Sequence, residues 1–189
     1  RSESKKYQKV ADMLTPMLKM MSSEYCNQNT YDSLQIHGGS GFMKDYPIER
    51  LYRDARITTI YEGTSQLQVV AAQRYVTNGG YLSLIKEYEQ MPVKSDFEPL
   101  KRILVEMTEQ FEKACGFLVG KESDYIDFHA RRLVEMASHI VMSYLLLIDA
   151  QQDDSFLNSA QIYINKSKAW NQERFDYVKD FSPCQLSSY

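Results

Sequence analysis

Chain-breaking residues are scarce in this sequence, which has 8 Gly and 5 Pro among 189 residues. An all-β protein needs many tight turns, and those turns are built largely from Gly and Pro. The composition, 43% hydrophobic and 25% charged, also excludes a disordered chain. We therefore predict an all-α protein whose length suits one domain or two small helical ones.

Cysteine is also scarce, and Cys26, Cys115 and Cys184 are too far apart to form a CxxC pair. This pattern excludes a disulfide framework and a zinc site, and it favours a reducing compartment, for which we expect the cytoplasm. The chain begins with Arg1 rather than methionine. We therefore expect the true N-terminus to precede it, which leaves a presequence for the mitochondrial matrix as an alternative.

The sequence has no excess of positive charge, with 22 Lys and Arg against 25 Asp and Glu. It therefore offers no strong basic patch for a nucleic acid backbone. The longest apolar run, residues 140–148, is too short for a transmembrane helix, which needs about 20 apolar residues. The three histidines, at positions 37, 129 and 139, lack the spacing of metal ligands, so we predict no metal site.

The first half of the chain reads as helices separated by glycine. Apolar residues recur at helical spacing over 4–36, where Pro16 should kink the helix or mark its true start. The glycines at 38, 39 and 41 should end this helix. Shorter helices are predicted over 48–57 and from Tyr61–Thr64 to about Val76.

A change of charge marks the region near residue 80, because residues 1–80 carry a small positive excess and residues 81–189 a negative one. Asn78, Gly79 and Gly80 form a strong stop signal at the same place. We therefore predict two domains, 1–80 and 81–189.

The second half reads as an antiparallel helical bundle. A short helix ends near Gln90, and Ser95 and Glu98 have the spacing of a capping box. Apolar stripes over 100–118, 126–148 and 156–170 predict three longer helices, the last capped by a residue of the run Asp153–Ser155. The predicted fold is thus a helical bundle followed by a second helical bundle segment.

Residue chemistry alone identifies no activity. Gly38 and Gly39 are most simply a helix C-cap, and Gly38-x-x-Gly41 is no dinucleotide fingerprint because no strand precedes it. Glu62 is most simply a carboxylate at a helix start. At the double glycine another group could approach the backbone closely, and the amides of Gly63, Thr64 and Ser65 could bind an anion or a polarised oxygen.

Four ordered motifs in residues 35–77 carry a family resemblance. They are Gln-Ile-His-Gly-Gly at 35–39, Tyr-Pro-Ile-Glu-Arg at 46–50, Tyr-Arg-Asp-Ala-Arg at 52–56 and Ile-Tyr-Glu-Gly-Thr-Ser-Gln at 60–66. This stretch resembles the C-terminal helical domain of the acyl-CoA dehydrogenase family, and residues 5–34 fit the helix before it. The role of residues 81–189 is not readable from this resemblance.

The resemblance implies a role for particular residues. Glu62 would be the catalytic base, which removes the α proton of an acyl-CoA thioester while the β hydride leaves to FAD, giving a trans-2-enoyl-CoA. Gly63 would leave room for the thioester beside the base. Two segments would contact FAD. The first consists of Thr64, Ser65 and Gln66. The second would reach the FAD of a neighbouring subunit and consists of Gln35, Ile36, His37, Gly38 and Gly39.

The resemblance also implies partners. The enzyme would be a homodimer or homotetramer and would pass electrons to an electron-transferring flavoprotein. Because the family's N-terminal helical and middle β domains are absent from this chain, we expect the chain alone to be inactive and to hold no FAD tightly. Other readings stay open: an acyl-CoA oxidase, a helical oligomerisation or assembly module, and a family scaffold put to another use.

Overall fold

The computed structural model describes residues 2–186, and every regular element among them is a helix. The all-α prediction is therefore confirmed over this range. The chain divides into two compact units, Arg1–Ala72 and Gln73–Tyr189, with the division inside a helix. The boundary predicted at residue 80 stays a prediction.

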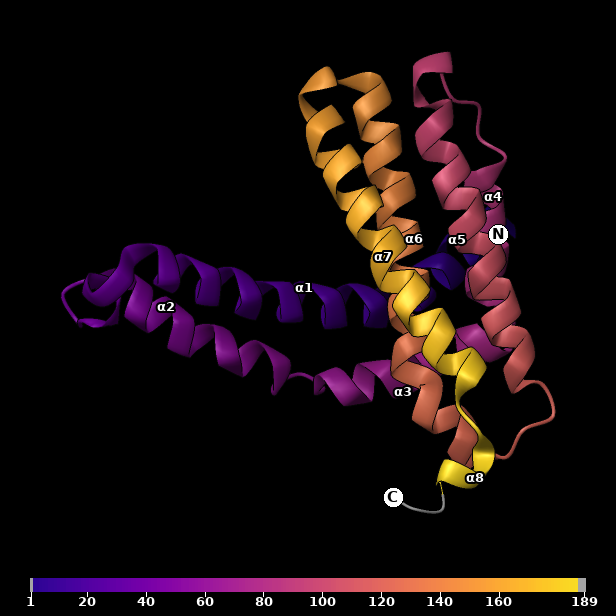
Figure 1. The fold of residues 1–189 in the computed structure, drawn as a ribbon, viewed down its shortest axis with the longest axis horizontal. Helices are drawn as coiled ribbons and strands as arrows, with labels where there is room; N and C mark the ends of the chain where they lie inside the picture. Colours follow the sequence, from indigo (N-terminus) through magenta and orange to yellow (C-terminus); the bar gives the residue numbers. More distant parts are fainter. Residues whose placement is uncertain (1, 187–189) are drawn as a thin grey trace. The chain divides into compact units, whose positions relative to one another are not determined.

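The first unit is a helical hairpin. Helix α1 (Ser2–Phe42) is followed by α2 (Pro47–Ala55), which returns along α1, then by the 3-10 turn η1 (Arg56–Thr59) and the start of α3 (Ser65–Thr77). Figure 1 shows α1 and α2 side by side, joined by a tight tip. One face of α1 is buried along four methionines at helical spacing, Met13, Met17, Met20 and Met21.

Helix α1 is interrupted at Gly38 and not at Pro16. Gly38 has non-helical angles, φ 60 and ψ −147, whereas Pro16 lies inside the helix. The predicted helix start at Pro16 is thus wrong, because α1 begins at Ser2, and the kink at Pro16 stays a prediction. Near the tip, a Cβ on Gly41 would lie 2.6 Å from the His37 Cβ, so the end of α1 can keep this close approach only with glycine at position 41.

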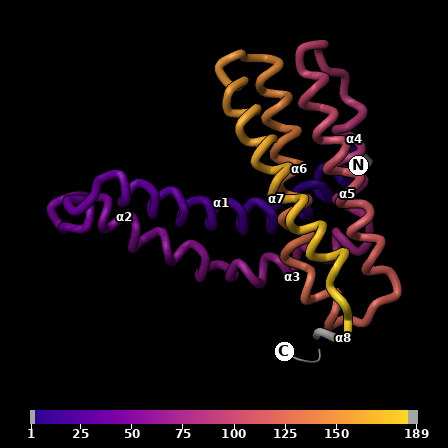
Figure 2. The backbone as a smooth tube through the Cα atoms, viewed as in Figure 1, coloured from indigo at the N-terminus to yellow at the C-terminus, as the bar shows by residue number. Residues whose placement is uncertain are grey.

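The second unit is an antiparallel bundle of α4 (Gly80–Glu89), α5 (Glu98–Leu118), α6 (Ser123–Gln152) and α7 (Leu157–Asp180), followed by α8 (Pro183–Leu186). Figure 2 shows α5, α6 and α7 running up and down beside one another. Fully buried side chains at helical spacing fill the centre of the bundle: Leu104, Met107, Phe111, Leu133, Met136, Ile140, Leu147 and Ile164. The bundle prediction is confirmed.

The ends of the helices differ from the predictions at two points. Ser95 caps no helix; it lies in the 3-10 turn η2 (Ser95–Phe97), and its hydroxyl donates to the Asp96 carboxylate. The capping box is therefore wrong, because this turn takes up the residues that the box would use. Of the predicted cap residues 153–155, Asp153 caps the turn η3 (Asp154–Phe156) before α7 by accepting from the Ser155 amide at 2.9 Å.

Among the described residues, one helix, α6, is long and apolar enough to cross a membrane by length and composition. Of its most apolar window, 67% is buried inside the protein. The core helix of a bundle meets the same criterion, so this observation is weak evidence for a membrane span.

Candidate active site

Glu62 lies in a turn between η1 and α3, where the backbone is forced into an unusual conformation. Its φ is 50, and among the described residues no other non-glycine residue has a positive φ. Gly63 follows with φ 90. Left-handed angles cost an ordinary residue about 1–2 kcal/mol. The prediction that Tyr61–Thr64 starts the helix is therefore wrong by a few residues, since α3 begins only at Ser65.

Gln68 holds this turn from the first turn of α3. Its side-chain amide donates to the backbone carbonyls of Glu62 at 3.3 Å and Gly63 at 3.4 Å. A Cβ on Gly63 would lie only 2.5 Å from the same amide nitrogen. Glycine at position 63 thus serves both the backbone angle and the approach of Gln68.

Thr64, Ser65 and Gln66, the three residues that follow Gly63, were predicted to contact FAD. They lie at the N-terminus of α3. Thr64 is the N-cap, because its hydroxyl accepts from the Leu67 amide at 3.2 Å. Ser65 is buried, and its hydroxyl has no hydrogen-bond partner among the described residues. Gln66 is exposed. Hydroxyl and amide donors therefore gather directly after Glu62.

The base of the turn is anchored to α1 by two residues that the sequence analysis did not identify. Asn27 donates through its side-chain amide to the Ala55 carbonyl at 3.0 Å and to the Thr58 hydroxyl at 3.3 Å. The Lys19 ammonium donates to the Thr58 carbonyl and lies 5.4 Å from the centre of the Tyr61 ring. Neither Asn27 nor Lys19 belongs to a motif, and each lies about thirty to forty residues from its partners in the sequence. No local sequence pattern therefore reveals their contacts.

The Glu62 side chain is exposed, and large apolar side chains surround it in the sequence. Ile60, Tyr61 and Leu67 are 48%, 49% and 59% exposed. No hydrogen bond or ion pair of the Glu62 carboxylate joins it to another residue of the described range. Apolar side chains left open to water beside a free carboxylate mark a surface that another molecule or domain can cover.

The other predicted FAD segment, Gln35–Gly39, lies near the tip of the hairpin. All five residues are exposed, with Ile36 at 85%, and a Cβ on Gly38 or Gly39 would meet nothing within 4 Å. The His37 ring pairs with the Ser33 carbonyl at 2.8 Å. Helix α2 and η1 separate this tip from Glu62 by about 20 Å of helix axis, so one chain does not bring the two segments into one site.

Two buried histidines lie in the second unit, which contains none of the predicted site residues. His129 and His139 are buried in α6, and both ring nitrogens of His129 and Nδ1 of His139 lack partners among the described residues. Burial lowers the pKa of His129 to about 4 and that of His139 to about 3, with smaller contributions from Arg132 and Arg174 respectively. No group of three metal-binding side chains occurs in the part of the chain that the structure describes.

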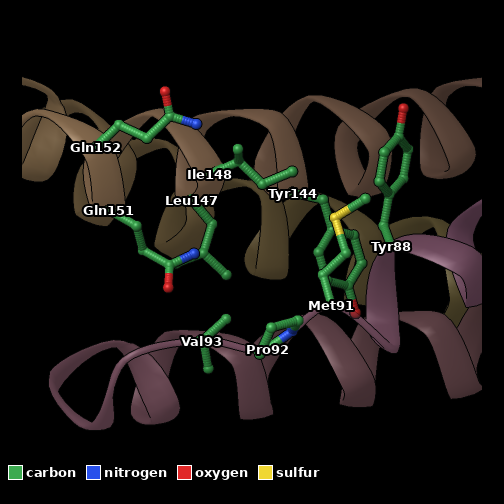
Figure 3. Close-up of a pocket in the computed structure, with 9 residues that line it drawn as sticks. All are labelled: Tyr88, Met91, Pro92, Val93, Tyr144, Leu147, Ile148, Gln151 and Gln152. Carbon is green, nitrogen blue, oxygen red and sulfur yellow. The ribbon is translucent and has the colours of Figure 1, made fainter.

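A cavity of about 260 Å³ lies between the α4–α5 connection and α6, and Figure 3 shows the residues that line it. Pro92 and Val93, from the α4–α5 connection, face Leu147 and Gln151 of α6. The Gln151 amide oxygen accepts from the Lys94 backbone amide at 2.9 Å, which ties the connection to the helix. The volume is below the usual range of about 300–1,000 Å³ for ligand pockets, and the lining offers no acid or base for catalysis at neutral pH.

Comparison with known families covers both units. Residues 2–76 match the family description "Acyl-CoA dehydrogenase, C-terminal domain", and residues 77–186 match "Acyl-CoA dehydrogenase C terminal". Residues 77–186 thus match a domain of this family, a relation that the sequence analysis did not find.

Three curated relatives match about a third of the chain. They are the acryloyl-CoA reductase (NADH) of Anaerotignum propionicum, 57% identical over 60 residues, the caffeyl-CoA reductase-Etf complex subunit CarC of Acetobacterium woodii, 56% over 52, and the acyl-CoA dehydrogenase of Bacillus subtilis, 46% over 63. These matches cover 32%, 28% and 33% of this chain. They span only 15%, 14% and 17% of the relatives' own lengths.

Two solved structures are similar. An acyl-CoA dehydrogenase family protein from Porphyromonas gingivalis is 40% identical, with a TM-score of 0.56, over 60% of this chain and 99% of that one. An acyl-CoA dehydrogenase from Bacillus anthracis, complexed with FAD, shares the fold at 22% identity and a TM-score of 0.60, over 92% of this chain and 34% of that one. The domain match over residues 77–186 and the Porphyromonas protein show that this chain belongs to the acyl-CoA dehydrogenase family.

Proposed function

We propose that this chain is the C-terminal part of an FAD-dependent acyl-CoA dehydrogenase and that Glu62 is its catalytic base. The observation that carries the proposal is the turn at Glu62, where a positive φ, Gly63 and the Gln68 amide together fix the backbone under an unpaired, exposed carboxylate. Strained backbone of this kind gathers at functional sites, because a fixed geometry there is worth its energetic cost.

The chemistry asks two things of the turn. The Glu62 carboxylate takes the α proton of the acyl thioester, and the electrons of that C–H bond form the new double bond as a hydride leaves the β carbon. FAD, when bound, accepts that hydride. The Glu62 backbone amide, which has no partner among the described residues, can donate to the thioester carbonyl as negative charge develops there.

The exposed apolar side chains beside Glu62 support this role. Ile60, Tyr61 and Leu67 would be covered when an acyl chain and the rest of the enzyme close over the turn. Gly63 leaves space for the thioester beside it.

The residues present fit FAD in two places. The unpartnered Ser65 hydroxyl, Thr64 and Gln66 offer hydrogen-bond donors next to Glu62, and the exposed Gly38 and Gly39 form a surface that no Cβ occupies. Since these two places lie at opposite ends of the hairpin, we propose that each FAD is held by Thr64–Gln66 of one subunit and Gln35–Gly39 of another. The active enzyme would then be at least a homodimer, with a homotetramer as the larger form.

The proposal extends to partners. One relative is named as a subunit of a reductase-Etf complex, which supports an electron-transferring flavoprotein as the electron partner here. Because the chain spans about 15% of the relatives' lengths, we expect the chain alone to hold no stoichiometric FAD and to turn over no acyl-CoA.

A second candidate is the same reaction in reverse. Two of the relatives are named as reductases of unsaturated acyl-CoA thioesters. In that direction a protonated Glu62 would give its proton to the α carbon of an enoyl-CoA. The site residues are the same for both directions, so substrate and electron supply decide between them.

The test uses the complete flavoenzyme that contains this chain. Acyl-CoAs of increasing chain length are added without oxygen, and bleaching of the flavin absorbance is followed in the natural enzyme and in Glu62→Gln. We expect bleaching that requires Glu62. Bleaching of equal rate in the variant, with FAD bound, would contradict the assignment of the base. Flavin that is reoxidised by an enoyl-CoA but is not bleached by any acyl-CoA would favour the reductase.

A further inference from the structure

Near the middle of α1, Lys19 reaches across to the segment that leads into the Glu62 turn. Its ammonium group donates to the backbone carbonyl of Thr58 and lies 5.4 Å from the centre of the Tyr61 ring. Lys19 itself is half-buried, and Tyr61 directly precedes Glu62 in the sequence. One side chain of α1 therefore contacts residues 58–61 at both ends of that segment.

The carbonyl that Lys19 binds lies at the C-terminal end of η1, where carbonyls have no partner within the helix. The two amides that follow η1 both donate to the Ile57 carbonyl, at 2.9 and 3.0 Å, and they leave the Thr58 carbonyl to Lys19. A lysine ammonium is a common partner for the last carbonyls of a helix. Lys19 thus caps η1 at a point four residues before Glu62.

The ring contact of Lys19 acts on the residue next to Glu62. Tyr61 is 49% exposed, so packing alone does not hold its ring. A cation over the face of an aromatic ring is attracted to the electrons of the ring. Lys19 therefore restrains the backbone that enters the turn and also the side chain directly before Glu62.

Lys19 serves this segment rather than the hairpin as a whole. None of the ion pairs within residues 2–186 includes it. The hairpin has other contacts that hold it together, because the methionine face of α1 is buried and the Asn27 side chain donates to the Ala55 carbonyl at 3.0 Å. Loss of the Lys19 ammonium group should therefore leave the hairpin folded and release mainly the segment before Glu62.

We propose that Lys19 is a positioning residue for proton abstraction, which it assists by fixing residues 58–61 and thereby the carboxylate of Glu62. This inference rests on the proposed role of Glu62 as the catalytic base. Gln68 holds the turn through two backbone carbonyls, and Lys19 holds the chain that enters the turn. The base is then held from both sides by side chains that lie outside the motif at 60–66.

The test uses the complete flavoenzyme and follows bleaching of the flavin without oxygen, over a range of concentrations of the acyl-CoA that bleaches the natural enzyme fastest. Lys19→Met keeps the length of the side chain and removes its charge and its donors, whereas Lys19→Arg keeps both. The matched control is Lys9→Met, at an exposed position of the same helix.

We expect the maximal bleaching rate of Lys19→Met to fall about tenfold, because a misplaced base reacts more slowly. The acyl-CoA concentration that gives half of the maximal rate and the FAD content should stay unchanged, since Lys19 contacts neither ligand in this account. Lys19→Arg should recover most of the rate, and Lys9→Met should keep all of it.

Different results would overturn the role of Lys19. A natural maximal rate in Lys19→Met would show that the contact does not position the base. An equal loss of rate in Lys19→Arg and Lys19→Met would show that a cation at this place is not the cause. A loss of rate together with a lower FAD content or a lower midpoint of urea unfolding would assign Lys19 to the stability of the fold instead.

Glu62→Gln in the same assay separates this inference from the proposed function. Slow bleaching in Glu62→Gln together with a natural rate in Lys19→Met would reject the role of Lys19 alone. Bleaching at the natural rate in Glu62→Gln would reject Glu62 as the base, and with it both proposals.

Discussion

The side-chain amide of Gln68 reaches back six residues to donate to the backbone carbonyl of Glu62 at 3.3 Å. This contact fixes the turn at the one described non-glycine residue with a positive φ. Glu62 presents its carboxylate from a conformation that the chain would not adopt unaided, and Gln68 supplies part of the stabilisation. Loss of the Gln68 contact should therefore act on catalysis more than on the fold as a whole.

Replacing Gln68 with leucine tests this relationship. The variant keeps a side chain of similar size but loses both donated hydrogen bonds, so the backbone that carries the carboxylate is no longer held in place. We expect the rate of flavin bleaching in the complete enzyme to fall by about tenfold to a hundredfold, since small displacements of a reacting group cost that much. The exposed Gln161→Leu on α7 is the control. Equal rates in the two variants would show that Gln68 does not position the base.

Replacing Gly63 with alanine should destabilise the first unit. The added Cβ would lie 2.5 Å from the Gln68 amide nitrogen, at a backbone φ of 90. We expect a loss of about 1–3 kcal/mol in the free energy of unfolding, measured with urea. Gly39→Ala is the matched control, because its Cβ would meet nothing within 4 Å. A Gly63→Ala variant as stable as Gly39→Ala would contradict the structure of the turn.

Asn27 should matter to stability through its contacts with the base of the turn. Asn27→Ala removes the hydrogen bonds to the Ala55 carbonyl and the Thr58 hydroxyl. We expect a loss of about 1–3 kcal/mol in the free energy of unfolding, as partly buried groups lose their partner. Asn29→Ala, at an exposed position one half-turn away, should change stability by less than about 0.5 kcal/mol. Similar effects of the two substitutions would rule out the anchoring role.

The second unit should lose stability in mild acid. A histidine in an unfolded chain titrates near 6.5, whereas burial holds the pKa of His129 at about 4 and that of His139 at about 3. Between these values the unfolded chain binds protons that the folded bundle does not. The contribution of the two neutral histidines to the free energy of unfolding is therefore fully present above pH 6.5 and decreases as the pH drops toward 4.

Histidine variants check this origin of the pH dependence. The His129 ring lies 4.6 Å from the Tyr125 ring and 5.2 Å from the Phe181 ring, so His129→Phe fits an aromatic site and removes the titrating group. We expect a flatter decline of stability between pH 6.5 and 4 in this variant, followed by urea unfolding at each pH. The exposed His37→Phe should leave the decline unchanged. A decline as steep in His129→Phe as in the natural chain would assign it to other groups.

Local patterns in the sequence predicted the helices well and the turn poorly. Apolar spacing located the bundle helices, and the cap before α7 was placed within residues 153–155 because one residue and its near neighbours decide a cap. The start of α3 was misplaced, because the positive φ of Glu62 depends on Gln68, which lies beyond the motif. Lys19 and Asn27 could not be found at all, since their partners come near them only when α2 folds back along α1.

The most direct test of the central claim follows the proton itself. The complete enzyme is incubated in D₂O with an acyl-CoA analogue that has sulfur in place of the β carbon and so cannot give up a β hydride. Deuterium incorporated at the α carbon is measured by mass spectrometry. We predict exchange in the natural enzyme and its loss in Glu62→Gln at equal FAD content. Exchange that persists at the natural rate in Glu62→Gln would show that another group removes the α proton and would contradict this account.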